Sequence, residues 1–182
     1  MDAVIIFLAS YLIFAIGLMA AFVAYKAKKR REFILALVIA GILALDLSIL
    51  AGVLYYNPRP FVSQGIEPLI SHSPDNGFPS QHTVIAMALT SVIYFSRRQI
   101  GAVALVLTFL VGAGRVWAHV HSWTDILGGL LIGATAGYVG VILARYLLTK
   151  FGPSERSASG RAARAADSFH ARRDEKPRRG VS

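Results

Sequence analysis

The chain has 182 residues, of which 55% are hydrophobic and 16% are charged, and its formal net charge is +9. Soluble globular domains carry about 25% charged residues, so this composition excludes an ordinary soluble domain and a disordered chain, and it indicates a membrane protein. The absence of cysteine excludes disulfides, a thiolate nucleophile and cysteine-ligated metal sites, which leaves histidine, acidic, serine and arginine side chains for any chemistry.

Five apolar segments predict five membrane-crossing helices. A helix needs about 20 apolar residues to cross the ~30 Å hydrocarbon core. Three segments have this length, and two shorter ones reach it only if their helices continue into polar residues at one membrane face. We therefore expect an all-α, polytopic transmembrane helical bundle. In chain order the segments are Ala3–Tyr25, Phe33–Tyr56, Thr83–Ser96, Ile100–Gly114 and Ile126–Ala144.

Basic residues predict how this bundle is oriented. The first apolar segment has no basic residue before it, unlike a cleavable signal peptide, so we expect it to remain as an anchor. Of the 19 lysines and arginines, 16 follow the first segment, separate the third from the fourth, or lie from residue 150 onward. Because lysine and arginine concentrate in cytoplasmic loops, we expect the N-terminus outside and the C-terminus in the cytoplasm.

Two regions follow from this pattern. We expect residues 1–150 to form a transmembrane domain in the cell (inner) membrane. Residues 151–182 are rich in glycine, serine, alanine and alternating charges, which cannot bury enough apolar surface to fold alone, so we expect a basic, disordered cytoplasmic tail. We interpret its charge as a topology signal that can also contact anionic lipid, and we expect no nucleic-acid partner.

The outer side of the expected bundle collects most of the remaining polar groups. These lie in residues 57–61, 75–82 and 114–125, and the basic side chains assigned to this side are Arg59 and Arg115. Polar groups at membrane depth normally face a bundle interior or a watery cavity. We therefore expect an extracytoplasmic site where these three segments meet.

His121 and Asp125 are four residues apart, so they share one face if a helix begins near His121. The carboxylate can then accept the proton of one imidazole nitrogen while the other faces a substrate, as a nucleophilic or basic histidine requires. Arg115 closes the preceding helix at the same level, and its guanidinium offers a planar fork of donors for phosphate oxygens. We expect this trio to be functional.

Ser80 and His82 mark the expected start of another helix. Pro79 suits the approach to the helix and Ser80 suits its N-cap, so the free N–H groups of the first turn would form an anion site. His82 lies in that turn, where it can protonate a leaving group. Arg59 adds a second guanidinium. Two arginines, two histidines, one acid and a helix N-terminus predict a site for a phosphoryl group.

Each of these features also has a simpler interpretation. A His-x3-Asp pair is often only hydrogen-bonded, and an arginine at a helix end often lies among lipid headgroups. His119, His121 and Asp125 could instead bind zinc, which we disfavour because two nearby arginines repel a cation. We expect no metal or other cofactor. His72 is expected to be a loop residue, and Asp46, inside an apolar segment, to hydrogen-bond a neighbouring helix.

These motifs resemble those of the type 2 phosphatidic acid phosphatase (PAP2) superfamily, whose pattern is Lys-x6-Arg-Pro, Pro-Ser-Gly-His and Arg-x5-His-x3-Asp. The resemblance covers about residues 52–131. The third block is complete, the second has Gln81 in place of glycine, and the first has Gly52 in place of lysine. The matching residues are Arg59 and Pro60, then Pro79, Ser80 and His82, then Arg115, His121 and Asp125.

The resemblance implies a phosphatase that uses neither metal nor cofactor. It implies that His121 is the nucleophile that takes the phosphoryl group, that Asp125 orients it, and that His82 protonates the leaving oxygen. The residues implied to hold the phosphate oxygens are Arg59, Arg115 and Ser80.

The substrate is also suggested by resemblance. Residues 57–82 are most similar to the bacitracin-resistance type of undecaprenyl-diphosphate phosphatase, which implies hydrolysis of undecaprenyl diphosphate to undecaprenyl phosphate and phosphate. Phosphatidylglycerophosphate, phosphatidate and lipid A are alternative substrates. A non-catalytic lipid-phosphate binder, and a scaffold that recruits partners through the basic tail, are alternatives from other functional classes.

Overall fold

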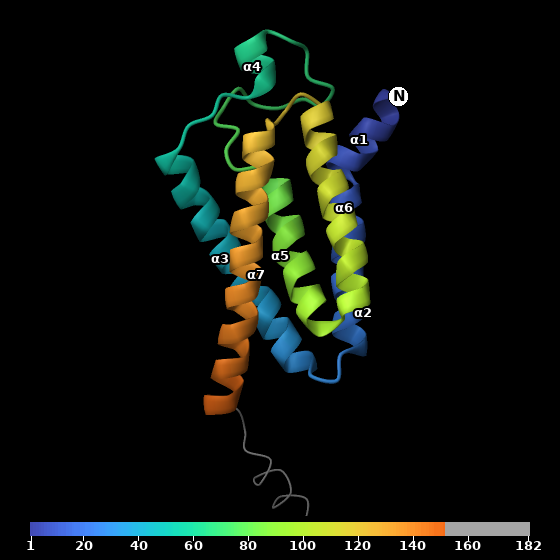
Figure 1. Ribbon diagram of the computed structural model, residues 1–182, viewed down its shortest axis with the longest axis vertical. Helices are drawn as coiled ribbons and strands as arrows, with labels where there is room; N and C mark the ends of the chain where they lie inside the picture. Colours follow the sequence, from blue (N-terminus) through green and yellow to red (C-terminus); the bar gives the residue numbers. More distant parts are fainter. Residues whose placement is uncertain (152–182) are drawn as a thin grey trace, which may run out of the picture. The chain divides into compact units, whose positions relative to one another are not determined.

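The computed structural model describes residues 1–151, which form seven α-helices and no strand (Figure 1). The expectation of an all-α protein is confirmed for these residues. The chain divides into two compact units, Met1–Tyr146 and Leu147–Ser182, and the packing below is that of the first. The expected tail lies outside the described residues apart from its first residue. The helices are α1 (Asp2–Ser10), α2 (Leu12–Lys26), α3 (Arg30–Leu54), α4 (Pro60–Gln64), α5 (Gln81–Ser96), α6 (Arg98–Trp117) and α7 (Trp123–Phe151).

The five expected apolar segments all appear as helices. The first is divided between α1 and α2 by a break at Tyr11, yet the Tyr11 N–H still donates to the Phe7 carbonyl at 2.9 Å. Within residues 1–151, four stretches are long and apolar enough to cross a membrane, and α5, with 16 residues, is shorter than these. The four are Asp2–Lys26, Arg30–Leu54, Arg98–Trp117 and Trp123–Phe151.

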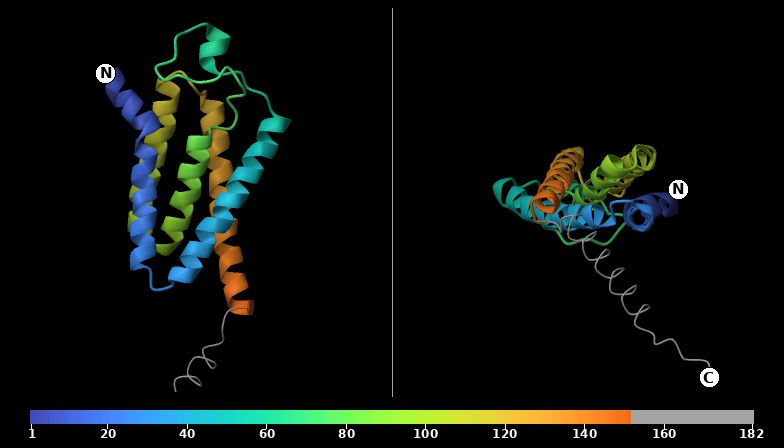
Figure 2. Two further views of the ribbon diagram at one scale, coloured as in Figure 1. Left: turned by 180° about the vertical axis from the view of Figure 1, so that it is seen from behind. Right: turned by 90° about the horizontal axis from the view of Figure 1, so that it is seen from below.

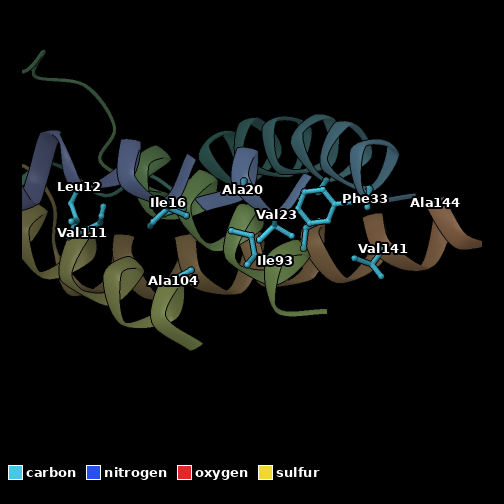
Figure 3. Packing of buried hydrophobic residues seen from close by; sticks show 14 residues of the cluster. Leu12, Ile16, Ala20, Val23, Phe33, Ile93, Ala104, Val111, Val141 and Ala144 are labelled. Atoms are coloured by element: carbon cyan, nitrogen blue, oxygen red, sulfur yellow. The ribbon is translucent and has the colours of Figure 1, made fainter. Parts of the chain in front are cut away.

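Apolar side chains cover both the inside and the outside of this bundle. Leu12, Ile16, Ala20 and Val23 recur at helical spacing on α2 and are buried against the other helices (Figure 3). The opposite side of the same helix exposes large apolar side chains instead. A soluble bundle would be polar there, so the helix suits an apolar solvent such as lipid. These exposed residues of α2 include Phe14, Leu18 and Phe22.

Glycine lets α7 approach α5 closely. A methyl group at Gly133 would collide with the Val84 carbonyl of α5, and one at Gly129 would lie 2.9 Å from the Thr83 Cβ atom. Glycines of α7 therefore serve close helix packing. The hydrophobic effect contributes little to the association of helices in lipid. Small residues at a helix crossing stabilise it instead, because they allow dense van der Waals contact.

Asp46 does not make the expected hydrogen bond among the described residues. Its side of α3 is exposed, whereas Ser48 is buried and accepts a hydrogen bond from the Gln81 side chain of α5. That expectation was wrong. Asp46 lies two positions before Ser48, which rotates its side chain by roughly 200° around the helix axis, away from the buried side that Ser48 occupies. The polar link from α3 to α5 thus uses Ser48.

Basic and chemistry-bearing residues gather at opposite ends of the first unit. The turns from α2 to α3 and from α5 to α6 lie at one end, and they carry Lys28, Lys29 and Arg97 (Figures 1 and 2). At that end Glu32 pairs with Arg145 at 2.9 Å. The other end carries α4 and the connections that contain the three predicted polar segments, so the candidate site lies there.

Candidate active site

Three connecting segments meet at the end of the bundle that carries α4 (Figure 1). The Gly77 N–H donates to the Asn57 carbonyl at 2.8 Å, and the Ser80 N–H donates to the Asp125 carbonyl at 3.1 Å. These bonds join parts of the chain that are far apart in sequence. The segments are residues 55–59 after α3, residues 65–80 between α4 and α5, and residues 118–122 between α6 and α7.

His121 and Asp125 are buried beside each other in this assembly. His121 Nδ1 lies 3.4 Å from Asp125 Oδ2, an electrostatic contact that lacks the alignment of a hydrogen bond. Because α7 begins at Trp123, His121 precedes the helix and Asp125 stands in its first turn. The expectation that both share one helical face is therefore wrong, although the pair itself forms across the start of the helix.

Asn57 holds the carboxylate of Asp125 in place. The Asn57 Nδ2 group donates to Asp125 Oδ1 and to Ser122 Oγ, both at 2.8 Å. The Ser122 N–H donates to Asp125 Oδ2 at 2.8 Å, so each carboxylate oxygen has a donor. Our reading of the sequence missed this role because Asn57 lies 68 residues from its partner and belongs to no local spacing pattern.

Arg59 is buried and uses its donors on three different groups. Its Nε donates to Asp75 Oδ1 at 2.7 Å, and its Nη1 donates to the Val120 carbonyl at 2.9 Å. The same Nη1 lies 3.3 Å from His121 Nε2. The hydrogen bond from Arg59 lowers the pKa of Asp75, so this carboxylate is charged at neutral pH.

The position of Arg59 distinguishes the two nitrogens of His121. A guanidinium can only donate, so we assign a lone pair to His121 Nε2 and the proton to Nδ1, which faces Asp125. Burial, followed by the charges of Arg115 and Arg59, lowers the pKa of His121 against the opposing effect of Asp125. His121 is therefore neutral at pH 7, with its free nitrogen directed at the arginine.

Arg115, at the end of α6, is also buried. Its Nη1 points at the Ala9 carbonyl over 3.5 Å, and its Nη2 is 2.6 Å from His72 Nε2. Its Nε has no hydrogen-bond partner among the described residues. An anion is the natural partner for this side of the guanidinium, because Nε and Nη2 together form a fork for two oxygens.

His72 is the largest omission of our sequence interpretation. It was expected to be an ordinary loop residue, and it does lie in the loop between α4 and α5. Its ring, however, bonds Arg115 and lies 6.1 Å from the His121 ring, centre to centre. Burial and the charges of Arg59 and Arg115 lower the pKa of His72 to about 4. It is therefore a neutral acceptor towards Arg115.

Ser80 and His82 lie at the start of α5, as expected. Ser80 is the N-cap residue, although its hydroxyl caps no N–H of α5 and instead accepts from the Thr83 hydroxyl at 3.2 Å. His82 is half-buried in the first turn, and its titratable neighbours are Arg115, His121 and His72. The structure thus brings all six predicted site residues to one end of the bundle.

The two departures from the family pattern both have structural roles. Gln81 donates to Ser48 and so joins α5 to α3. The Gly52 carbonyl accepts a hydrogen bond from Asn76 Nδ2 at 2.8 Å, and a side chain at Gly52 would begin 3.1 Å from the Phe78 carbonyl. Position 52 therefore anchors the loop that carries Asn76.

A zinc site is not what these residues form. Among residues 1–151, no three histidine, cysteine, aspartate or glutamate side chains gather as metal ligands. His119 is exposed in a left-handed backbone conformation (φ 62°), whereas His121 and Asp125 are buried. The alternative of a His119–His121–Asp125 zinc site lacks this geometric support.

Gly77 lies against the site so closely that we expect Gly77→Ala to lower activity about 10²-fold. An added methyl would lie 2.9 Å from Asp125 Oδ2 and 3.2 Å from the Asn57 carbonyl, so it would displace the carboxylate that faces His121. The measurement is the turnover of the purified variant. Gly41→Ala is the control, because a methyl there meets no atom within 4 Å. Equal activity of both variants would contradict this packing.

Known proteins match this chain over most of its length. The pattern of the family described as "PAP2 superfamily" matches residues 30–148. The chain is 32% identical over 140 residues to undecaprenyl-diphosphatase BcrC of Bacillus subtilis, covering 76% of this chain and 72% of that protein. It is 35% identical over 136 residues to the bacitracin transport permease protein BcrC of Bacillus licheniformis, covering 73% of this chain and 66% of that protein.

A solved structure gives the same result for the fold. The crystal structure of Aquifex aeolicus LpxE aligns with a TM-score of 0.62 and 26% sequence identity, covering 77% of this chain and 84% of that chain. With the apolar helices described above, these similarities make the chain a multi-pass membrane protein.

Proposed function

The chain belongs to the PAP2 superfamily, a family of lipid phosphatases, and from this we propose that it removes the terminal phosphate of undecaprenyl diphosphate to give undecaprenyl phosphate and phosphate. The observation that carries the proposal is the environment of His121. Its lone-pair nitrogen faces Arg59, and its other nitrogen faces a carboxylate held by two hydrogen bonds. A histidine so arranged is suited to nucleophilic attack.

The first half of the proposed reaction transfers the phosphoryl group to His121. Nε2 attacks the terminal phosphorus, a P–N bond forms, and the bond from that phosphorus to the bridging oxygen breaks. The proposed role of His82 is to give its proton to the departing lipid phosphate. Asp125 stabilises the positive charge that develops on the imidazole as Nε2 becomes bonded to phosphorus.

The second half returns the enzyme to its starting state. Water attacks the phosphohistidine, a P–O bond forms and the P–N bond breaks, which releases phosphate. Neutral His82, having lost its proton in the first half, takes one from the water. Arg59, Arg115 and Ser80 are proposed to hold the phosphate oxygens throughout and to stabilise the charge of the transition state. The proposal uses neither metal nor cofactor.

We also propose a topology that brings the lipid to this chemistry. It has five crossings, with α5 as the one between α3 and α6, the N-terminus outside and the C-terminus in the cytoplasm. The basic turns at the end opposite the site support this orientation, because such residues favour the cytoplasmic side. The site would then lie on the extracytoplasmic face of the inner membrane, where a lipid tail can remain in the bilayer while its headgroup enters.

Residues 151–182 complete the proposal as a separate basic tail. Residues 1–150 would contain all of the catalytic machinery, and the tail would act as a topology signal that can contact anionic lipid. Removal of the tail should then leave hydrolysis by the remaining membrane domain unchanged.

The deciding experiment is an assay of phosphate release by detergent-purified protein in the presence of EDTA. The substrates are undecaprenyl diphosphate, phosphatidate, phosphatidylglycerophosphate and lipid A. We expect release that survives EDTA and is fastest with undecaprenyl diphosphate. A faster reaction with another lipid would change the proposed substrate while leaving the mechanism in place. Binding of lipid phosphate without release from any substrate would favour the non-catalytic binder instead.

The pH dependence of kcat/KM should reflect the lowered pKa of His121. Attack requires neutral imidazole, so the rate should fall only as the pH drops through a value below the ordinary 6.5. Arg59 is one of the charges that lower this pKa, so Arg59→Gln should move the acid limb to higher pH. The substrate's own titration is common to both proteins, so the measured quantity is the difference between them. An unmoved or lower limb would contradict the assignment.

A further inference from the structure

Arg59 and Arg115 lie together at the site. The proposed function leaves one of their neighbours without a role. His72 lies in the loop between α4 and α5 and contacts Arg115 directly, at 2.6 Å between Nε2 and Nη2. Our sequence interpretation gave it no role, and the proposed reaction steps do not use it. Its contact is nonetheless with the guanidinium that is proposed to bind phosphate.

The Nε–Nη2 edge of Arg115 indicates where phosphate would arrive. Nη1 is directed at the Ala9 carbonyl, which leaves Nε and Nη2 as the fork available to an anion. Nε is buried without a partner among the described residues, and Nη2 is occupied by His72. A phosphate that used both donors would therefore take the position at which His72 now accepts, and it would lie against the imidazole ring.

The balance of charge around His72 changes when phosphate binds. His72 is surrounded by Arg115 of α6, Arg59 at the start of α4, and His121, with Asp75 of its own loop as the opposing charge. His82 of α5 is a further titratable neighbour. A bound dianion would offset both guanidinium charges, and it would favour an imidazole N–H directed at its oxygens.

We propose that His72 is a third phosphate-binding residue, which releases Arg115 to the incoming phosphate, takes up a proton from solvent on Nε2, and donates that N–H to one of the phosphate oxygens. This inference rests on the proposed function and adds a donor to it. His72 would also supply a third side-chain contact to phosphate in a chain that has Gly52 where the family pattern has a lysine. His72 takes no part in bond making or breaking.

The test compares two amides of different length at position 72 with a matched control. His72→Asn is too short to reach the phosphate, His72→Gln reaches about as far as the imidazole Nε2, and His119→Asn removes an exposed histidine of the neighbouring loop. The probe is inorganic phosphate, measured by direct binding to the detergent-purified full chain and as a competitive inhibitor of hydrolysis. Asparagine suits the left-handed conformation of His119, so the control should fold normally.

We expect His72→Asn to weaken phosphate binding about tenfold, as for loss of a hydrogen bond to a charged group, with a matching rise in KM and a smaller change in kcat. His72→Gln should recover most of the loss, and His119→Asn should bind like the wild type. Equal binding by His72→Asn and wild type would overturn the inference, as would an equal loss in the Asn and Gln variants with a lowered melting temperature. Failure of the proposed function looks different, because the wild type itself would then bind phosphate without hydrolysing any lipid.

Discussion

His121→Asn is expected to reduce phosphate release about 10⁴-fold or more, the largest effect of any single substitution in this chain. His121 supplies the nitrogen that forms the P–N bond, and an amide has no comparable lone pair. Asparagine is small, polar and uncharged, so it should fit the buried position without leaving an unpaired charge, and the variant should fold. The measurement is single-turnover release of phosphate from undecaprenyl diphosphate, which separates chemistry from lipid binding.

His119→Asn is the matched control for this experiment. It changes the same residue type two positions away, where the side chain is exposed, and it should keep wild-type turnover. A second readout is the phosphoenzyme itself: protein quenched during turnover should carry phosphate in a form that acid removes and base does not, as a P–N bond requires. Residual turnover in His121→Asn close to that of the control would assign the nucleophile elsewhere.

Asp125→Asn is expected to lower kcat by about 10³- to 10⁴-fold while preserving the fold. The carboxylate faces His121 Nδ1 at 3.4 Å and accepts hydrogen bonds from Asn57 and Ser122. An amide in its place would direct an NH2 group at one of these donors, and it could no longer favour the proton on His121 Nδ1. Substrate binding should change little, because Asp125 contacts no proposed phosphate oxygen. Turnover and KM of the purified variant check this split.

A double variant separates the orientation of His121 from the stability of the loop. Asn57→Asp combined with Asp125→Asn restores a complementary carboxylate–amide pair between positions 57 and 125. The carboxylate then stands at position 57 and the amide at position 125. The melting temperature, which should be lower in the Asp125→Asn variant than in the wild type, should recover in the double variant. The turnover of the double variant should stay low. Recovery of turnover along with stability would show that Asp125 acts only as a structural anchor.

The fold class and the positions of the main helices could be predicted from the sequence because lipid imposes a simple condition. Every backbone group must be satisfied within the segment that crosses, and the segment must be about 20 apolar residues long. This condition leaves a signal in composition, for example in the uncharged run that forms α1 and α2. It carries less information about α5, which has only 16 residues, half of them buried by neighbouring helices.

The candidate site could be predicted in part for a different reason. Arg115, His121 and Asp125 are close in sequence, so their spacing alone predicts that they lie near one another. Spacing could not show that α7 begins only at Trp123, because the start of a helix depends on loop contacts. The shared helical face was therefore a wrong expectation, while the His121–Asp125 contact itself is present at 3.4 Å.

The sequence by itself determined that this is a membrane protein with a helical fold, and it indicated which side chains could bind and react with a phosphate. Only the tertiary structure decided that Asn57 holds Asp125, that Asp75 holds Arg59, and that His72 covers Arg115. These contacts join the ends of helices through loops whose residues have no periodic pattern. A hydrogen bond depends on positions to within a few tenths of an ångström, and the packing of the whole bundle sets such positions.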